Sequence, residues 1–326
     1  MSMSTAATAG RADRILLLGV ARSGTRWLAT TLGNTDGSRL VKEPDNVDAN
    51  PAGGGRSRLG FGAYPEVDRG DAAPQYRALW DLAFSARVPN RAGWKRSAAR
   101  AALRLPRPVR DPLLRRTAQA MSALPGRPAH VVVKSIYAPF AAEWLADTYQ
   151  PRVIVIQRHP LNVISSWAEL GVHGFDVLDR PSIRTRHLER LGIALPGPGA
   201  SRLQLISTWV ALLSTVLGEH LDRHPEWLLV THEDLCVDPE RAIRDVAGRV
   251  GLTWTEHTTR FLNQSNRPGT GFSHERVTRD QPDRWRGRLD DSQVTEIEAV
   301  LAQFPSLGWV RPPDRRPVPE PSLSLT

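Results

Sequence analysis

The sequence is poor in cysteine and lacks a long apolar segment. Its single cysteine, Cys236, excludes an intrachain disulfide and is compatible with a reducing compartment. The longest apolar segment, residues 203–217, is shorter than a membrane span and contains polar side chains. The apolar run that follows Arg14 is similar to the hydrophobic region of a signal peptide. Cleavage there would destroy a glycine-bearing loop at residues 19–24. We therefore expect a cytoplasmic, soluble protein with no membrane span.

Lysine is also scarce, although the chain is basic. The formal net charge is +9, and of the 43 lysines and arginines only Lys42, Lys95 and Lys134 are lysines. A basic balance favours anionic ligands such as nucleotides, phosphorylated or sulfated acceptors, and nucleic acid. The preference for arginine is equally typical of a GC-rich genome, so it does not identify the ligand. At 326 residues with 40% apolar residues, the chain can bury a sizeable core.

The most informative stretch is RILLLGVARSGTRW, residues 14–27. It predicts a short buried strand over residues 15–18, a loop containing Gly19 and Gly24, and a helix that begins within residues 23–25. Glycines let a backbone approach an anion, and the unpaired N–H groups of a first helical turn point toward it. The stretch therefore predicts a phosphate-binding loop.

This loop differs from the P-loop of nucleotide-binding proteins. The glycine spacing is the same, but Thr25-Arg26 stands where that motif has Lys-Ser/Thr, and the basic residue is Arg22 instead. A P-loop kinase also needs a strand-ending aspartate for Mg²⁺, whereas two later predicted strands end at Lys134 and Arg158. The alternative to a phosphate site is a simple glycine turn with a solvated arginine.

Predicted strands and helices alternate along the chain. We expect further strands at residues 39–41, 130–134, 152–157 and 227–230, a loop over 176–200, and a long helix over 203–222. This alternation predicts an α/β fold, a P-loop-like doubly wound parallel sheet flanked by helices. Ligands of such sheets bind at the carboxyl ends of the strands. The basic and imidazole side chains expected at these ends are Arg22, Lys134, Arg158 and His232.

We expect a single domain over residues 11–310. A disordered arm, residues 1–10, precedes it, and a proline-rich tail, residues 311–326, follows it. An insert at about residues 50–127 is expected to be mostly helical and basic, with ten arginines and lysines over residues 87–116. These side chains face either solvent or an anionic acceptor. The few aromatic residues among them argue against binding of single-stranded nucleic acid.

Two motifs resemble those of the sulfotransferases that use 3'-phosphoadenosine 5'-phosphosulfate (PAPS). R-S-G-T-x-W-L, from Arg22 to Leu28, resembles their 5'-phosphosulfate loop. R-x-P-x-x-x-x-x-S, from Arg158 to Ser166, resembles their 3'-phosphate motif, in which an arginine fork and a serine hydroxyl clasp one phosphate. The resemblance implies that the nucleotide is bound by Arg22, Ser23, Gly24, Thr25, Arg26, Trp27, Arg158 and Ser166.

Two later segments extend the resemblance. T-H-E-D-L, which begins at Thr231, is similar to a family stretch in which a tyrosine contacts adenine, and here His232 stands in the place of that tyrosine. The resemblance implies that His232 contacts the base, while a structural histidine is the alternative. Residues 274–289 resemble the C-terminal loop that closes over the nucleotide, with Arg276 and Arg279 as further 3'-phosphate ligands. A surface turn is the alternative there.

The catalytic base follows from the same resemblance. In the small-molecule branch of the family the base is a histidine just after a strand-ending lysine, and the strand that ends at Lys134 lacks it. The tyrosylprotein branch and some glycan branches use a glutamate beyond the phosphate loop, and Glu43 lies 21 residues after Arg22. The resemblance implies that Glu43 is the general base, with Asp45 as its substitute. Pairing of Glu43 with Lys42 or an arginine of the insert is the alternative.

The resemblance implies in-line transfer of a sulfuryl group from PAPS to a hydroxyl of a small-molecule, sugar or natural-product acceptor. Arg22, Lys134 and the loop N–H groups would stabilise the charge that develops on the leaving adenosine 3',5'-bisphosphate (PAP). No metal is required, because a sulfuryl group carries less charge than a phosphoryl group; His220 and His224 lack an evident third ligand. The alternatives are a non-catalytic nucleotide or nucleic-acid binding protein and a P-loop kinase.

Overall fold

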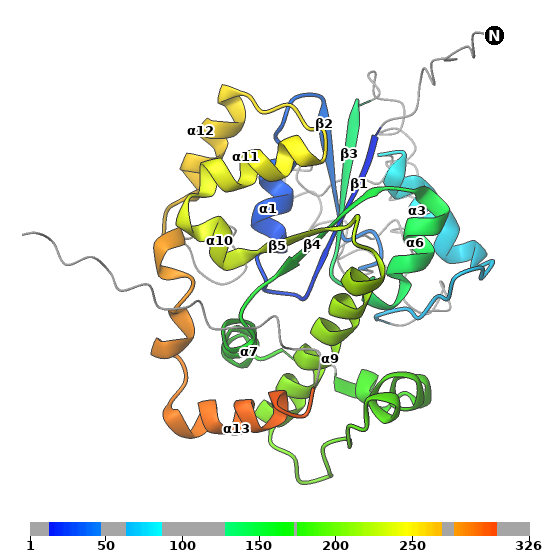
Figure 1. The fold of residues 1–326 in the computed structure, drawn as a ribbon, viewed down its shortest axis with the longest axis vertical. Coiled ribbons are helices and arrows are strands. Elements are labelled where there is room, and N and C mark those ends of the chain that lie inside the picture. Colours follow the sequence, from blue (N-terminus) through cyan, green and yellow to red (C-terminus); the bar gives the residue numbers. More distant parts are fainter. Residues whose placement is uncertain (1–12, 47–62, 87–127, 173–174, 269–276, 305–326) are drawn as a thin grey trace, which may run out of the picture.

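Five parallel strands form one sheet in the order β2-β3-β1-β4-β5 (Figure 1). The computed structural model describes residues 13–46, 63–86, 128–172, 175–268 and 277–304. The five strands lie where the sequence predicts them, with small shifts at their ends. Their bounds are β1 (Asp13–Gly19), β2 (Ser38–Lys42), β3 (His130–Ser135), β4 (Arg152–Gln157) and β5 (Leu228–Thr231).

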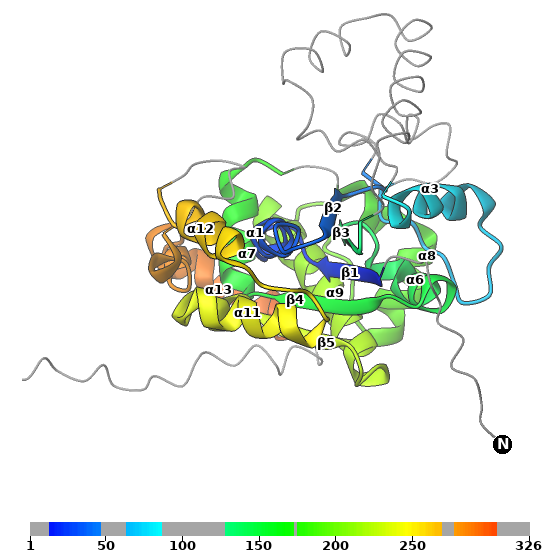
Figure 2. The same ribbon diagram turned by 90° about the horizontal axis from the view of Figure 1, so that it is seen from above.

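The central strand β1 is buried on both faces. Leu16 and Leu18 pack into one hydrophobic cluster, whereas Ile15 and Leu17 pack into a second cluster on the other side of the sheet. Successive side chains of a strand point to opposite faces, so a continuous apolar run requires helices on both sides. Helices lie on both sides of the sheet (Figure 2). The predicted fold class, a doubly wound parallel sheet flanked by helices, is confirmed.

The two helical layers come from different parts of the chain. The cluster around Leu16 and Leu18 includes residues of α3 (Pro74–Phe84), α6 (Ala142–Tyr149), α7 (Pro160–Glu169), α9 (Arg202–Arg223) and α13 (Asp291–Leu301). The cluster around Ile15 and Leu17 includes residues of α1 (Thr25–Leu32), α10 (His232–Val237), α11 (Pro239–Arg249) and α12 (Glu256–Ser265). No helix within the described ranges is both long and apolar enough to cross a membrane.

One described part of the expected insert belongs to the main core. Helix α3 buries Tyr76, Trp80 and Phe84 in the cluster that covers the sheet. Residues 47–62 and 87–127, which include the ten basic residues, lie outside the described residues, and so do the expected arm and tail. The expected boundaries therefore stay predictions.

The loop predicted over residues 176–200 is wrong for its first half. Four short helical segments replace it: η4 (Phe175–Asp179), α8 (Pro181–Ile183), η5 (Arg184–Leu188) and η6 (Glu189–Leu191). Their buried side chains, Val177, Leu178, Ile183 and Leu188, join the main core. The apolar residues of this stretch are spaced by one or two helical turns, a pattern that indicates helix. The proline and the many charged residues between them are more typical of a loop, and the prediction followed these residues.

The register of the sheet aligns the carboxyl ends of its strands. In the parallel ladders Lys134 of β3 pairs with Lys42 of β2 on one side and with Leu17 of β1 on the other. Gly19, the last residue of β1, pairs with Ile156 of β4. The segments that leave β1, β2, β3 and β4 therefore emerge at one edge, where ligands of such sheets bind.

Candidate active site

The loop after β1 has the geometry expected of an anion-binding turn. Gly24 precedes the first residue of α1 with a left-handed φ of 93°, and Arg22 also has a positive φ of 76°. The buried Ser23 hydroxyl donates a hydrogen bond to the Val20 carbonyl oxygen, 2.7 Å away. A Cβ atom at Gly19 would lie 2.7 Å from the carbonyl oxygen of Ile156, so only glycine permits the loop to leave β1 so close to β4.

His232 lies behind this loop. Its imidazole is buried, and it contacts the edge of the Trp27 ring with 6.0 Å between the ring centroids. Burial, and secondly the charge of Arg158, hold the pKa of His232 well below its usual range, so the ring is neutral at neutral pH. This position gives His232 a packing role against the loop; its predicted contact with adenine stays a prediction.

The two predicted phosphate motifs meet in space. Arg22 Nε donates a hydrogen bond to Ser166 Oγ over 3.0 Å, although 144 residues separate the two in sequence. Arg158 extends from the end of β4, and its Nη1 atom donates to the Arg22 carbonyl oxygen over 3.1 Å. The motifs at residues 22–28 and 158–166 therefore form one polar cluster.

In the part of the chain that the structure describes, backbone oxygens hold Arg158 and no carboxylate contacts it. Its Nη2 atom donates to the Gln281 carbonyl oxygen over 2.9 Å, and its buried Nε atom has no hydrogen-bond partner among the described residues. Burial lowers the pKa of Arg158 to about 10, against the opposing attraction of Glu233. Glu233 therefore acts on Arg158 only as a longer-range attraction. A buried cation with an unused donor is suited to an anionic ligand.

Glu43 and Lys134 form a buried ion pair at the ends of β2 and β3. The Glu43 N–H also donates to the Lys134 carbonyl oxygen over 2.6 Å, and Asn46 Nδ2 donates to Glu43 Oε2 over 2.9 Å. The expected alternative partner Lys42 therefore does not hold this carboxylate. Glu43 has a left-handed φ of 48°, a conformation that turns the chain at the end of β2.

The pair has perturbed protonation equilibria. Burial raises the pKa of Glu43, but the charge and hydrogen bond of Lys134, together with the Asn46 hydrogen bond and the charge of Arg26, lower it overall. Burial lowers the pKa of Lys134, only partly opposed by Glu43. Arg26 is exposed, yet its charge contributes to lowering the pKa of both residues. The positive charge of Arg26 therefore acts on both Glu43 and Lys134.

Asp45 supplies a second carboxyl group at this edge of the sheet, two residues beyond Glu43. It is buried, accepts a hydrogen bond from the Ser135 hydroxyl at 2.8 Å, and receives the Tyr76 hydroxyl at 3.5 Å. Burial raises the pKa of Asp45 to about 7. The sequence names Asp45 only as a substitute base and gives no sign of its bond to Ser135. Two carboxyls with pKa values displaced in opposite directions thus lie at one edge of the sheet, a pattern typical of acid–base sites.

Of the two predicted C-terminal arginines, Arg279 is described, and it does not join this cluster. The Arg279 side chain is 86% exposed and contacts the neighbouring Asp280 at 3.5 Å. Arg276 lies outside the described residues. The contact of the C-terminal segment with Arg158 runs instead through the backbone carbonyl of Gln281.

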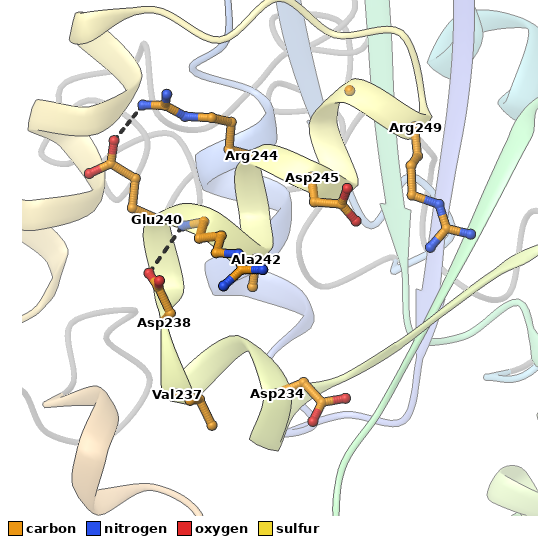
Figure 3. A pocket seen from close by; sticks show the side chains of 10 residues that line it. Asp234, Val237, Asp238, Glu240, Ala242, Arg244, Asp245 and Arg249 are labelled. Carbon is orange, nitrogen blue, oxygen red and sulfur yellow. Dashed lines mark hydrogen bonds and ion pairs between the residues drawn. The ribbon is translucent and has the colours of Figure 1, made fainter.

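Two other polar regions lie away from these residues. A surface hollow on α10 and α11 is lined by charged side chains of both signs, among them Asp234, Asp238 and Arg244 (Figure 3). Asp238 caps α11 by accepting from the Arg241 N–H. This hollow contains no residue predicted to bind the nucleotide.

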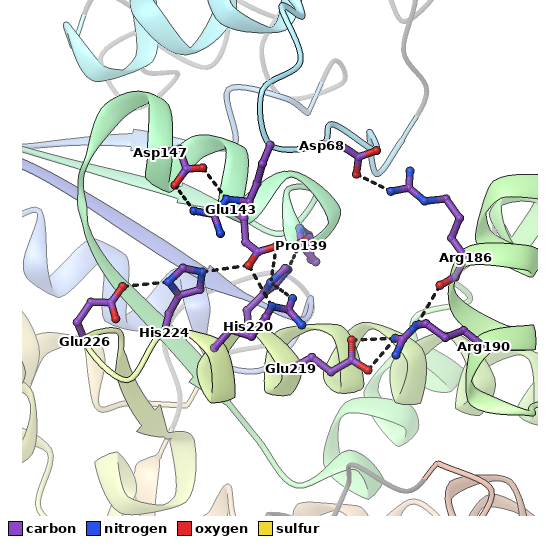
Figure 4. Close-up of polar contacts among 12 residues, drawn as sticks. Asp68, Pro139, Glu143, Asp147, Arg186, Arg190, Glu219, His220, His224 and Glu226 are labelled. Atoms are coloured by element: carbon purple, nitrogen blue, oxygen red, sulfur yellow. Dashed lines mark hydrogen bonds and ion pairs between the residues drawn. The ribbon is translucent and has the colours of Figure 1, made fainter.

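His220 and His224 belong to a network around Glu143 (Figure 4). The His220 Nε2 atom hydrogen-bonds the Pro139 carbonyl oxygen at 2.8 Å, and His224 contacts Glu143 and Glu226 at 3.0 Å each. Within the described ranges, no group of three or more histidine, cysteine or acidic side chains is arranged to hold a metal ion. The network therefore joins α9 to α6 by polar contacts.

Comparison with known proteins supports the fold. No family model matches the chain. No curated protein matches it either. Among solved structures, the sulfotransferase domain from the curacin biosynthetic pathway aligns with a TM-score of 0.50 at 14% identity, over 90% of this chain and 98% of that chain. The sulfotransferase domain of the Synechococcus olefin synthase aligns with a TM-score of 0.46 at 16% identity, over 90% and 96%.

A mouse sulfotransferase complexed with PAP aligns with a TM-score of 0.45 at 10% identity, over 90% of this chain and 85% of that chain. The alignment with the curacin-pathway domain spans almost the whole of both chains. The chain therefore has the α/β fold of a sulfotransferase domain, in agreement with the resemblance of its sequence motifs.

Proposed function

We propose that this protein is a PAPS-dependent sulfotransferase that transfers a sulfuryl group to the hydroxyl of a small-molecule, sugar or natural-product acceptor. The observation that carries the proposal is the bond of Arg22 to Ser166, with Arg158 bonded to the same loop. Two motifs that resemble the 5'- and 3'-phosphate sites of one nucleotide thus share a single cluster. The fold of the curacin-pathway sulfotransferase domain supports the proposal.

In this proposal the loop after β1 binds PAPS, the sulfuryl donor. The N–H groups of Ser23, Gly24 and Thr25 at the start of α1 bind the sulfuryl and 5'-phosphate oxygens, where a helix N-terminus favours negative charge. Arg158 takes the 3'-phosphate together with the Ser166 hydroxyl, which Arg22 contacts from the 5'-phosphosulfate loop. PAPS is the co-substrate and PAP the product.

Glu43 is the general base in the proposed mechanism. Its carboxylate takes the proton of the acceptor hydroxyl as the hydroxyl oxygen forms a bond to sulfur and the bond from sulfur to the bridging oxygen of PAPS breaks. Lys134 and Arg22 stabilise the negative charge that passes to the bridging oxygen of PAP. When Lys134 turns to that oxygen, Glu43 loses the partner that lowers its pKa and becomes a stronger base. The ion pair of the ligand-free protein is thus a resting state.

A transfer assay with PAPS and a panel of hydroxyl acceptors tests the proposal beside calorimetry with PAP and ATP. We expect PAP to bind at least tenfold more tightly than ATP. Glu43→Gln should bind PAP normally and lose roughly 10²–10⁴-fold in turnover. The control is Glu256→Gln at an exposed position of α12. Equal affinity for PAP and ATP contradicts the proposed donor, whereas full turnover by Glu43→Gln contradicts only the base.

A further inference from the structure

A small cavity lies between the loop that follows β1, the end of β4 and helix α9. It is lined by aliphatic side chains, by Arg158, and by three further polar residues, namely Ser23 of the loop, Gln157 of β4 and Ser214 of α9. About 10 Å³ of its space is open to a water molecule, and this is close to the least that one buried water needs. The cavity is therefore too small for an organic ligand and large enough for one water molecule.

The amide of Gln157 is buried at this cavity. Side chains alternate along β4, so Gln157 lies on the same face as Val153 and Val155, which pack into the cluster that contains α7 and α9. Gln157 is only 5% exposed, and neither its Nε2 atom nor its Oε1 atom has a hydrogen-bond partner among the described residues. A buried amide without partners is costly, because it has given up its bonds to bulk water. Gln157 therefore calls for a partner within the cavity.

Two buried hydroxyl groups line the same cavity. Ser23 Oγ donates its proton to the Val20 carbonyl oxygen, which leaves its lone pairs able to accept a hydrogen bond. Ser214 brings a second hydroxyl from α9, and a hydroxyl both donates and accepts. A water molecule can bond to the Gln157 amide and to both hydroxyls, and three bonds are typical of a buried water. The lining thus supplies the polar partners that such a water needs.

The other small guests fit this lining less well. The guanidinium of Arg158 lines the cavity, and its charge repels a metal cation. A chloride ion is larger than a water molecule and only accepts hydrogen bonds, so it would leave the Gln157 carbonyl oxygen unpaired. Water both donates and accepts, and it carries no net charge.

We propose that this cavity holds one ordered water molecule that bridges Gln157 to Ser23 and Ser214, and that Gln157 is a positioning residue for the loop after β1. Ser23 immediately precedes Gly24, which leads into the first turn of α1. The bridge ties this part of the loop to a strand and a helix of the core. The water site does not depend on the proposed function, whereas its effect on nucleotide affinity rests on it.

Crystals of the full chain, at a resolution that shows ordered water, test the site directly. We expect a density peak within hydrogen-bond distance of the Gln157 amide and of both serine hydroxyls. Gln157→Met removes both polar atoms at similar side-chain length, and its cavity should show no peak. A wild-type cavity without density overturns the water site. An anomalous signal at this position after a bromide soak also overturns it, because the guest is then a halide.

Urea unfolding of Gln157→Met, Ser214→Ala and the double variant measures the bridge in solution. Two residues that share one water are coupled, so the double variant should change the unfolding equilibrium constant about three- to tenfold less than the product of the single effects. Gln157→Met combined with Ser207→Ala is the matched control, because Ser207 lies in the same helix and donates to the Leu203 carbonyl oxygen. The control effects should multiply. Multiplying effects for the Ser214 pair overturn the bridge.

Calorimetry with PAP separates positioning from a role in stability alone. Gln157→Met should weaken PAP by about three- to tenfold, the range for one lost hydrogen bond. Ser214→Ala should weaken PAP in the same direction through the same water, and Ser207→Ala should keep wild-type affinity. Wild-type affinity in Gln157→Met contradicts the positioning role. If the wild type itself fails to bind PAP, the proposed function fails, while the density and the unfolding constants still decide the water site.

Discussion

Gly24 and His232 are packed so closely that no side chain fits between them. A Cβ atom at residue 24 would lie 2.4 Å from His232 Cδ2, well inside van der Waals contact. The φ of 93° at Gly24 also disfavours any residue with a Cβ. The loop can therefore keep this conformation only with glycine at this position.

We predict that Gly24→Ala abolishes measurable PAP binding at concentrations that saturate the wild type. The alanine must push the buried imidazole or move the loop, and either change displaces the N–H groups that begin α1. Gly70→Ala is a matched control, since Gly70 has a similar φ of 88° and open space around it. The control should lose about 1–2 kcal/mol of stability from backbone strain and keep PAP affinity. Normal binding by Gly24→Ala in calorimetry would show that the loop does not hold the nucleotide.

The serine that receives Arg22 provides a second prediction. Ser166→Ala removes the acceptor at 3.0 Å from Arg22 Nε and should weaken PAP by about tenfold, the effect of one hydrogen bond to a charged group. Ser165→Ala is the control, because the Ser165 hydroxyl donates to the Asn162 carbonyl within its own helix. Titration calorimetry on both variants shows which of the two serines, Ser165 or Ser166, contributes to PAP binding. A larger loss for Ser165→Ala would transfer the phosphate contact to that residue.

The Glu43–Lys134 pair leads to a pH prediction. Lys134→Gln removes the charge that lowers the pKa of Glu43 and leaves burial, which raises it. The proposed base, Glu43, must be ionised to act, so the acidic limb of the kcat/KM profile should move to higher pH. Rates measured between about pH 4.5 and 8.5 test this shift. Lys42→Gln, which removes the neighbouring lysine, should leave the limb in place. An unmoved limb in Lys134→Gln indicates that another group titrates.

The elements of this site were predictable from sequence because their signals are local. An apolar run before Gly19 and Gly24 indicates a buried strand and a tight turn, and the motifs that begin at Arg22 and Arg158 each lie within nine consecutive residues. Parallel topology then requires these strand ends to share an edge. The approach of Arg22 to Ser166 follows from these two facts together.

The remaining features depend on contacts that have no local signature. The contact of Arg158 with Gln281 uses a backbone carbonyl, which every residue possesses. Asn162 of helix α7 donates a hydrogen bond to the main-chain carbonyl oxygen of Pro282, 120 residues away. The burial of Asp45 depends on Tyr76 and Ser135, which reach it from separate elements. Tertiary packing alone brings such groups together, so sequence motifs give no indication of them.

Asp45 provides the last prediction, which concerns stability. Its pKa is about 7 in the folded protein against the ordinary value of 3.8, so the folded state binds the proton more tightly than the unfolded chain. The stability gained in this way is fully present below pH 3.8 and is lost as the pH rises toward and through 7. Between about pH 5.5 and pH 8 the loss should be on the order of 2 kcal/mol.

Asp45→Asn should remove this pH dependence, because the amide stays neutral and can still accept from Ser135. Urea unfolding of wild type and variant at the two pH values measures the effect as a change in the difference between their free energies of unfolding. Asp36→Asn, at an exposed position, serves as the control and should unfold in parallel with wild type. If the difference between Asp45→Asn and wild type is the same at both pH values, Asp45 is ionised throughout. Its hydrogen bond from Ser135 would then stabilise a buried carboxylate next to Glu43, and the acid–base pattern of this edge would be lost.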